Sequence, residues 1–206
     1  MKDVADVVVG SQDSTFGTGL LYTKSMNTIL EKNSTAEEIA KNIILSSDRI
    51  GKDFLRRPNR KGVIPNVFTV AAYKTANSGN LISEINNLSS LLIKNISTLK
   101  QSIKVALDGT HPFSIDDDGL GGQRDLHEIL QRLNTVISDA NIKSAISKTT
   151  TALNKTILLA KIHNSEKHAQ GMAINISPTA VTSEAYKATL FAKNTKWDEF
   201  IEMVNK

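Results

Sequence analysis

The segment that decides the fold lies at the start of the chain and reads Val4-Ala5-Asp6-Val7-Val8-Val9-Gly10-Ser11-Gln12-Asp13. Its run from Val4 to Val9 is rich in β-branched residues and apolar on both faces, which is typical of a buried strand. The stretch from Ser11 to Gly19 is polar and contains glycine, which indicates a loop. Because α/β folds place their binding groups in loops that follow buried strands, we expect this loop to carry function.

Beyond this segment, strand and helix patterns alternate along the chain. Short β-branched or apolar runs predict strands over residues 4–9, 67–73, 157–162 and 172–176. Capping residues and apolar residues at helical spacing predict helices over residues 34–50, 81–103, 126–137, 141–153 and 197–204, and a short helix is expected over 20–30. The last two strands flank a polar turn, which is the pattern of a hairpin. The fold class predicted by this alternation is α/β.

Composition excludes several classes of protein. The chain has 206 residues, 40% of them apolar and 22% charged, which suits one globular domain or at most two small ones. It contains no cysteine, so these residues supply no disulfide, no thiolate zinc site and no cysteine nucleophile. No stretch approaches the roughly 18–20 apolar residues of a membrane helix. The residues from Met1 to Asp6 carry acids early, so we expect no membrane span and no signal peptide in this chain.

The charge pattern gives little support to nucleic-acid binding. The net charge is +4, but 25 basic and 21 acidic residues are interspersed, so we expect no nucleic-acid partner. One basic cluster stands out, Arg56-Arg57-Pro58-Asn59-Arg60-Lys61, and no aromatic residue accompanies it to stack on bases. We interpret it as a solvated loop or a proteolysis-prone linker, with contact to an anion or a nucleic acid as the alternative.

Metal sites are weakly indicated. The four histidines, at positions 111, 127, 163 and 168, form no His-Glu-x-x-His pattern. His163 and His168 are expected in a surface turn, and His127 on a solvated helix face. The acidic run Asp116, Asp117 and Asp118, near Asp125, is a calcium candidate because crowded oxygen ligands beside a glycine suit that ion. Its spacing does not match an EF-hand, so we interpret it as an acidic surface turn.

Catalytic motifs are equally scarce. The chain has no phosphate-binding glycine loop of the Walker type and no Gly-x-Ser-x-Gly turn around a serine nucleophile. From the residues alone we predict no catalytic group in this chain, and no cofactor beyond the calcium candidate.

Two blocks nevertheless resemble clostripain-like cysteine peptidases. The first is the opening segment together with Gly17-Thr18-Gly19 and Tyr22-Thr23-Lys24, which is similar to a family strand that leads through Ala-Ser-Gln-Glu into Gly-x-Gly. The second runs from Gly171 to Pro178 and on to Leu190-Phe191-Ala192-Lys193-Asn194-Thr195-Lys196-Trp197-Asp198-Glu199-Phe200, which is similar to a closing Phe-Ala-x-x-Thr-x-Trp-Asp-x-Phe signature. The blocks occur in the family's order and span nearly the whole chain.

The resemblance implies a caspase-like α/β sandwich, with a central sheet flanked by helices. Residues 1–206 would be the C-terminal portion of one such domain: a pocket strand and loop in 1–75, helices in 76–155, and closing strands and helix in 156–206. In this family a cysteine thiolate paired with a histidine cleaves peptides after Arg or Lys. Both groups lie upstream of the segment matched here, so the resemblance implies a partner, the N-terminal chain of the same peptidase, that carries His and Cys.

The resemblance also assigns the binding residues. Ser11, Gln12, Asp13 and Thr15 would line the specificity pocket, where hydroxyls and a carboxylate suit a guanidinium or ammonium group. It further implies a bacterial protein that is secreted, periplasmic or held at the cell surface. The alternative function is a catalytically inactive pseudopeptidase or a binding and regulatory module that keeps the fold without the chemistry.

Overall fold

The computed structural model describes residues 4–11, 34–55, 67–113, 122–164 and 168–206. The chain forms two compact units. The first consists of residues 1–76 and 156–172, and the second of residues 77–155 and 173–206.

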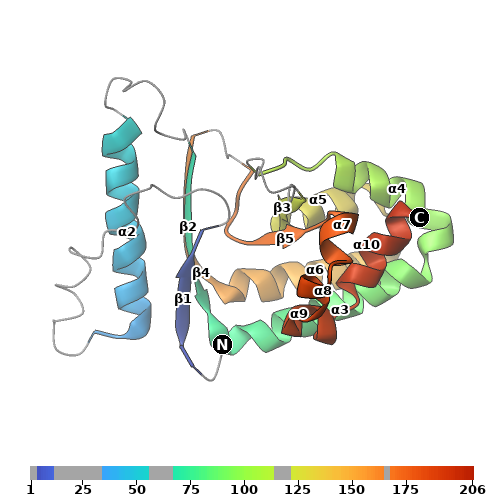
Figure 1. Ribbon diagram of the computed structural model, residues 1–206, viewed down its shortest axis with the longest axis horizontal. Helices are drawn as coiled ribbons and strands as arrows, with labels where there is room; N and C mark the ends of the chain where they lie inside the picture. The colour runs from blue at the N-terminus through green and yellow to red at the C-terminus, as the bar shows by residue number, and fades with distance from the viewer. Residues whose placement is uncertain (1–3, 12–33, 56–66, 114–121, 165–167) are drawn as a thin grey trace. The chain divides into compact units, whose positions relative to one another are not determined.

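The first unit is built on a three-stranded antiparallel sheet (Figure 1). Strand β1 (Val7–Gly10) pairs with β2 (Val67–Lys74), and β2 pairs with β4 (Ile157–Asn164), so that β2 is central. Helix α2 (Ala36–Leu55) covers one face of this sheet. The segments expected at 34–50, 67–73 and 157–162 are confirmed as helix, strand and strand, and the short helix expected over 20–30 lies outside the described residues.

Helix α2 packs through small and branched side chains. Ala40 and Ile44 lie against Val70 and Ala72 of β2, and all four are buried. The helix begins with a capping box, in which the Glu38 amide donates to Thr35 Oγ1 at 3.2 Å and the Thr35 amide donates to Glu38 Oε2 at 2.8 Å. The Thr35 hydroxyl also donates to Glu38 Oε2, at 2.9 Å, and the two bonds that Thr35 donates to the carboxylate lower the pKa of Glu38, the one from the backbone amide most strongly.

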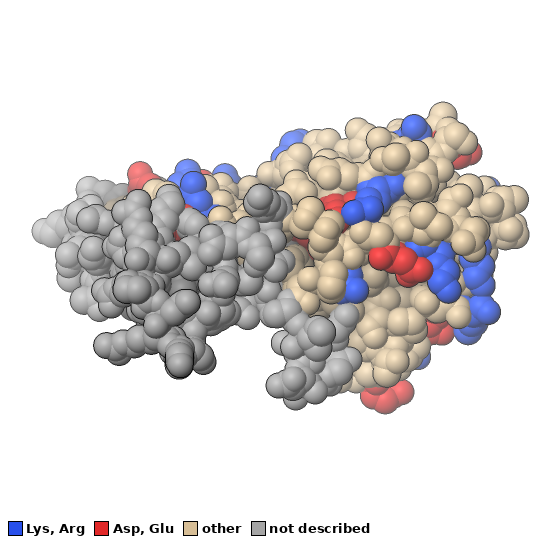
Figure 2. Space-filling view, turned by 90° about the horizontal axis from the view of Figure 1, so that it is seen from above, with Lys and Arg blue, Asp and Glu red and all other residues tan. Residues whose placement is uncertain are grey.

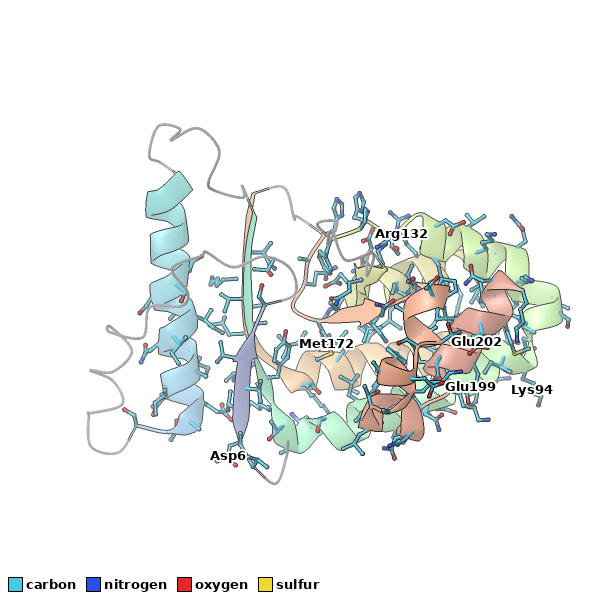
Figure 3. The ribbon with its side chains drawn as sticks, in the orientation of Figure 1. Asp6, Lys94, Arg132, Met172, Glu199 and Glu202 are labelled. Atoms are coloured by element: carbon cyan, nitrogen blue, oxygen red, sulfur yellow. The ribbon has the colours of Figure 1, made fainter. Side chains whose placement is uncertain are left out.

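Strand β1 differs from its prediction in bounds and burial. It begins at Val7 instead of Val4, whose side chain is 88% exposed, and its residues are half-buried. Asp6, at the start of the strand (Figure 3), accepts a hydrogen bond at its carbonyl from the Thr75 amide at 3.0 Å. Among the described strands β1 pairs with β2 alone, so it is an end strand of the described sheet and not the fully buried strand that its apolar run predicted.

The second unit is mainly helical. Its longer helices are α3 (Ser78–Lys94), α4 (Ile96–Asp108), α5 (Leu126–Val136), α6 (Ala140–Thr156) and α10 (Trp197–Asn205). Its short elements are the 3₁₀ turn η1 (Thr75–Asn77) at its boundary, α7 (Pro178–Val181), α8 (Glu184–Lys187), α9 (Leu190–Asn194), and the paired strands β3 (Gln123–Asp125) and β5 (Ala173–Asn175). Helices α5, α6 and α10 confirm three predicted helices, and their fully buried residues include Leu130, Leu133, Trp197 and Phe200.

The single helix predicted over 81–103 is wrong, because the chain breaks at Asn95 between α3 and α4. The Asn95 side chain donates from Nδ2 to the Leu91 carbonyl at 2.9 Å, and its amide donates to Leu91 and Leu92. An asparagine that bonds backbone carbonyls of the preceding turn competes with helix propagation. The periodic apolar pattern continues across the break and hides it.

The hairpin expected between residues 157–162 and 172–176 is also wrong. Both strands exist, but β4 pairs with β2 while β5 pairs with β3 in a separate two-stranded sheet. Between the two strands Gly171 has a φ of +121°, which other residues rarely adopt, and an added Cβ there would lie 3.2 Å from Ala160 Cβ of β4. The chain therefore passes over the side chains of β4 instead of pairing with its edge.

Candidate functional site

The end of β1 carries the first candidate group. Ser11 follows directly after the strand, and its Oγ lies 2.8 Å from Thr69 Oγ1 of β2 in a hydrogen bond. Thr69 is 1% exposed, whereas Ser11 is half-buried. The last backbone pair of the β1–β2 ladder is Gly10 with Ala71. The residue at which the predicted pocket loop begins is therefore held to the sheet by a side-chain bond.

The start of β1 is held in a similar way by a second threonine. Thr75 Oγ1 donates to the Asp6 carbonyl at 3.1 Å and also to the Ala5 carbonyl, and Thr75 is 7% exposed. Strand β1 is thus tied to β2 and the residue after it by buried threonines at both ends. This arrangement fixes both the position of the strand and the point where the chain leaves it.

Of the two hydroxyl-bearing side chains at the end of β1, that of Ser11 is half-buried, whereas that of Thr69 is 1% exposed. Ser11 is therefore the member of the pair that a polar ligand could contact, and Thr69 is its buried support. Of the four predicted pocket residues, Ser11 lies at this point, and Gln12, Asp13 and Thr15 lie outside the described residues. Sequence reasoning missed Thr69, for which the available signal was a single polar residue within the apolar run Phe68 to Ala72.

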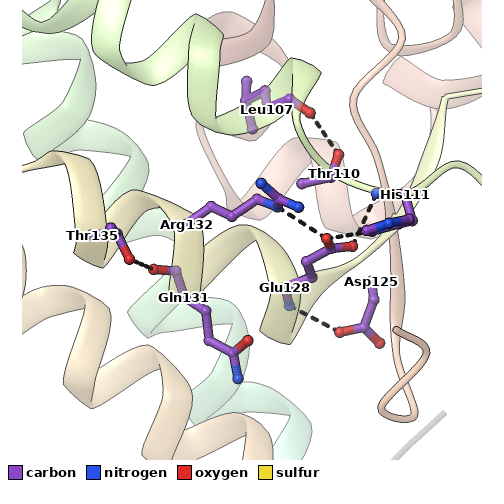
Figure 4. Close-up of polar contacts among 8 residues, drawn as sticks. All are labelled: Leu107, Thr110, His111, Asp125, Glu128, Gln131, Arg132 and Thr135. Carbon is purple, nitrogen blue, oxygen red and sulfur yellow. Dashed lines mark hydrogen bonds and ion pairs between the residues drawn. The ribbon is translucent and has the colours of Figure 1, made fainter. Parts of the chain in front are cut away.

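A second polar cluster is centred on Glu128 of α5, in the other unit (Figure 4). The His111 amide donates to Glu128 Oε2 at 3.0 Å, and His111 Nδ1 lies 2.7 Å from Oε1. Arg132 donates from Nε to Oε1 at 2.9 Å. The Glu128 side chain is 7% exposed, so this carboxylate is a buried acceptor that ties the turn after α4 to α5.

The environment of Glu128 has two opposing effects on its pKa. Burial alone raises the pKa, but the hydrogen bonds from the His111 amide, the His111 ring and Arg132 outweigh that effect and hold the pKa below its ordinary value of 4.5. A carboxyl whose pKa is lowered on folding stabilises the folded state at pH above its unfolded pKa. That stabilisation is lost as the pH falls through the folded value.

We therefore expect Glu128→Gln to destabilise the protein by about 1–3 kcal/mol at pH 7, because hydrogen bonds to a charged acceptor are lost. Wild-type stability should fall as the pH drops below about 4.5, and the variant should show less of this fall. Urea unfolding at a series of pH values measures both effects. Glu199→Gln, at an exposed carboxylate of α10 (Figure 3), is the matched control. Equal pH profiles for Glu128→Gln and wild type would contradict the assignment.

The acidic calcium candidate receives no support from its described member. Asp125 is 1% exposed and is the N-cap of α5, where its Oδ1 accepts from the Glu128 amide at 3.0 Å. Asp116, Asp117 and Asp118 lie outside the described residues, as does the basic cluster at 56–61. Calcium binding at this acidic run stays a prediction.

Two histidines differ from their predicted placement. His127 is 8% exposed instead of lying on a solvated face, and its Nε2 lies 2.6 Å from Asn154 Oδ1 of α6. The buried surface of helix α5 is wider than its apolar face, because the polar residues His127 and Glu128 in its first turn are buried along with Leu126. His163 lies in strand β4 opposite Phe68 instead of in a turn, because the strand extends to Asn164; its side chain lies outside the described residues. His168 is half-buried and lies in a turn.

The surface charges of the described residues are mixed. In the face shown in Figure 2, acidic and basic side chains lie side by side. Within the part of the chain that the structure describes, no helix has the length and apolar character needed to cross a membrane.

Comparisons with known proteins identify solved structures that share this fold. No protein-family model matches the chain, and no curated protein matches it in sequence. Solved structures do match: a B. fragilis cysteine protease has a TM-score of 0.66 at 15% identity, over 95% of this chain and 81% of that chain. A secreted C11 cysteine protease from Bacteroides thetaiotaomicron, in complex with an irreversible peptide inhibitor, has a TM-score of 0.64 at 13% identity, over 96% of this chain and 54% of that one.

A clostripain from Bacteroides thetaiotaomicron ATCC 29148, solved with a peptide inhibitor, matches with a TM-score of 0.60 at 12% identity, over 94% of this chain and 78% of that one. The chain has the α/β fold of these cysteine proteases, and the resemblance inferred from the sequence is confirmed at the level of fold. The chain spans about half the length of the secreted C11 protease.

Proposed function

We propose that this chain is the C-terminal part of a clostripain-like cysteine endopeptidase that cleaves after Arg or Lys. The observation that carries the proposal is the likeness of about 95% of the chain to solved cysteine proteases, one of which extends well beyond the region matched. The chain supplies scaffold and one wall of the specificity pocket. The catalytic histidine and cysteine come from outside these 206 residues.

The residue content supports this division of labour. The chain has no cysteine, so the thiolate that attacks the peptide carbonyl must belong to another region or another chain. Among the described strands β1 has one paired edge, and its other edge is a suitable place for a strand brought by the N-terminal partner. In this scheme the partner performs the chemistry and this chain orients the substrate.

The pocket wall is proposed to consist of Ser11, Gln12, Asp13 and Thr15. Ser11, held by its hydrogen bond to buried Thr69, would present its hydroxyl at the end of β1. Asp13 would pair with the charge of an arginine or lysine side chain. Thiolate catalysis of this kind needs no cofactor, and we propose none, with calcium at Asp116, Asp117 and Asp118 as the alternative. A secreted bacterial location is supported by the secreted protease among the similar structures.

The test is to purify the protein that carries this chain from its native source and to measure its partners and activity together. Native mass spectrometry should find the chain bound to a polypeptide region that contains cysteine. The same sample should hydrolyse peptide bonds that follow Arg or Lys and should leave bonds that follow Leu or Glu uncut. A soluble 22.5 kDa species that hydrolyses nothing would contradict the proposal and favour the inactive binding module.

Within the assembled peptidase, Asp13→Asn should lower kcat/KM for Arg and Lys substrates by about 10- to 100-fold, because a charged hydrogen bond is worth about 1.5–3 kcal/mol. Asp6→Asn, at an exposed aspartate at the start of β1, is the matched control and should leave kcat/KM unchanged. If Asp13→Asn cleaves as efficiently as wild type, Asp13 does not read the basic side chain.

A further inference from the structure

We infer that Thr69 is a positioning residue for the proposed pocket: its hydroxyl holds Ser11, the described member of the pocket wall, in place at the end of β1. This inference rests on the proposed function for its consequence on substrates. The contact between Thr69 and Ser11 is independent of that function: it is observed in the first unit, between residues far apart in the sequence.

The first step of the argument concerns Thr69 itself. It lies on the central strand β2 with 1% of its surface exposed, so its hydroxyl is a buried polar group that requires a hydrogen-bond partner. A β-branched side chain has little freedom at χ1, so the backbone of β2 fixes where Oγ1 lies. Thr69 Oγ1 is therefore a rigid anchor point.

The second step concerns the end of the backbone ladder. The paired residues of β1 and β2 run from Val7 with Lys74 to Gly10 with Ala71. Ser11 follows the last of these pairs, and the 2.8 Å bond between its Oγ and Thr69 continues the connection by one residue. Loss of that bond would leave Ser11 without this side-chain connection to β2.

The third step links position to function. Groups that recognise a substrate must be held within about 0.5 Å of their productive position, and a displacement of about 1 Å can cost 100-fold in rate. Thr69 acts on substrate through Ser11. We therefore expect its loss to weaken substrate binding more than the chemical step.

The chain supplies a matched control at the opposite end of β1. Thr75 is also buried, and its hydroxyl also bonds the β1 segment, at Ala5 and Asp6. Thr69→Val and Thr75→Val each remove one buried hydroxyl with little change in shape. The two variants thus disturb the same strand, but only Thr69→Val acts at the pocket end.

The experiment uses the purified assembly of this chain with its proposed partner chain. It compares four variants of this chain: Thr69→Val, Thr69→Ser, Thr75→Val and Ser11→Ala. Thr69→Val should raise KM for Arg and Lys substrates two- to tenfold with kcat nearly unchanged, in line with the loss of one hydrogen bond. Thr69→Ser should restore KM, and Thr75→Val should leave it unchanged. Ser11→Ala should raise KM at least as much as Thr69→Val, because it removes the bond to Thr69 and also the proposed contact of Ser11 with the substrate.

A second readout is independent of activity. Hydrogen exchange of the Ser11 amide should be about two- to tenfold faster in Thr69→Val than in wild type, and close to wild type in Thr75→Val. Equal exchange in Thr69→Val and wild type, or equal acceleration in both valine variants, would overturn the inference. Absence of cleavage in the wild-type protein would refute the proposed function instead, and the exchange measurement would still decide the role of Thr69.

Discussion

Replacing Trp197 by alanine is expected to lower the free energy of unfolding by about 3–5 kcal/mol, the largest effect among the substitutions proposed here. The Trp197 ring is 1% exposed at the start of α10. Its centroid lies 5.4 Å from that of Phe200, and its Nε1 donates to the Asn175 carbonyl of β5 at 2.8 Å. Alanine removes the packed ring and leaves both a cavity and a carbonyl without its donor.

Trp197→Phe separates these two contributions. Phenylalanine fills much of the space of the indole but has no N–H to donate to Asn175, so we expect a loss of about 1–3 kcal/mol. Urea denaturation followed by circular dichroism measures both variants. A loss below about 1 kcal/mol for Trp197→Ala would mean that α10 is not held by this residue.

The second large effect is expected for Gly122→Ala, with a loss of about 3 kcal/mol or more. A Cβ at Gly122 would lie 2.6 Å from Asn175 Oδ1 and closer still to the backbone nitrogen and Cβ of Ser177. The Gly122 carbonyl also accepts a hydrogen bond from the Ile176 amide at 2.8 Å, so the segments around these two residues cannot move apart without loss of that bond. The pairing of β3 with β5 depends on this close approach.

Gly79→Ala is the matched control for this substitution. Gly79 lies in the first turn of α3, is exposed, and has no atom within 4 Å of an added Cβ. Alanine there should stabilise the protein by about 0.5–1 kcal/mol, because glycine is the poorer helix former. Thermal unfolding of the two variants should therefore shift in opposite directions. A neutral or stabilising Gly122→Ala would show that β3 and β5 are not so closely packed.

Helices with a capping pair or with regularly spaced apolar residues within their own span could be predicted from the sequence. The start of α2 follows from the capping pair Thr35 and Glu38, and α10 follows from the spacing of Trp197, Phe200 and Val204. Strand pairing could not be predicted in the same way. Whether β4 pairs with β2 or with β5 depends on partners distant in the chain and on the turn at Gly171, and short polar β3 has no β-branched run to mark it.

The candidate site shows the same limit. Ser11 could be selected because a polar loop follows a strand pattern and because the segment resembles a known family. Thr69 could not, because it is brought to Ser11 only when β1 and β2 pair across 58 positions of sequence. The burial of His127 and Glu128 was missed because helical spacing marks the apolar stripe and gives no information about polar residues that meet a neighbouring helix or turn.

The central claim is that these residues support a cysteine peptidase whose nucleophile lies elsewhere. The most direct test treats the purified native protein with a biotinylated peptide that ends in lysine and carries a thiol-reactive ketone, and then locates the biotin by tandem mass spectrometry. We expect one label, on a cysteine outside residues 1–206, with loss of peptide cleavage in proportion to labelling. Failure to label any cysteine in a sample that contains the folded chain, or cleavage that survives full labelling, would contradict the claim.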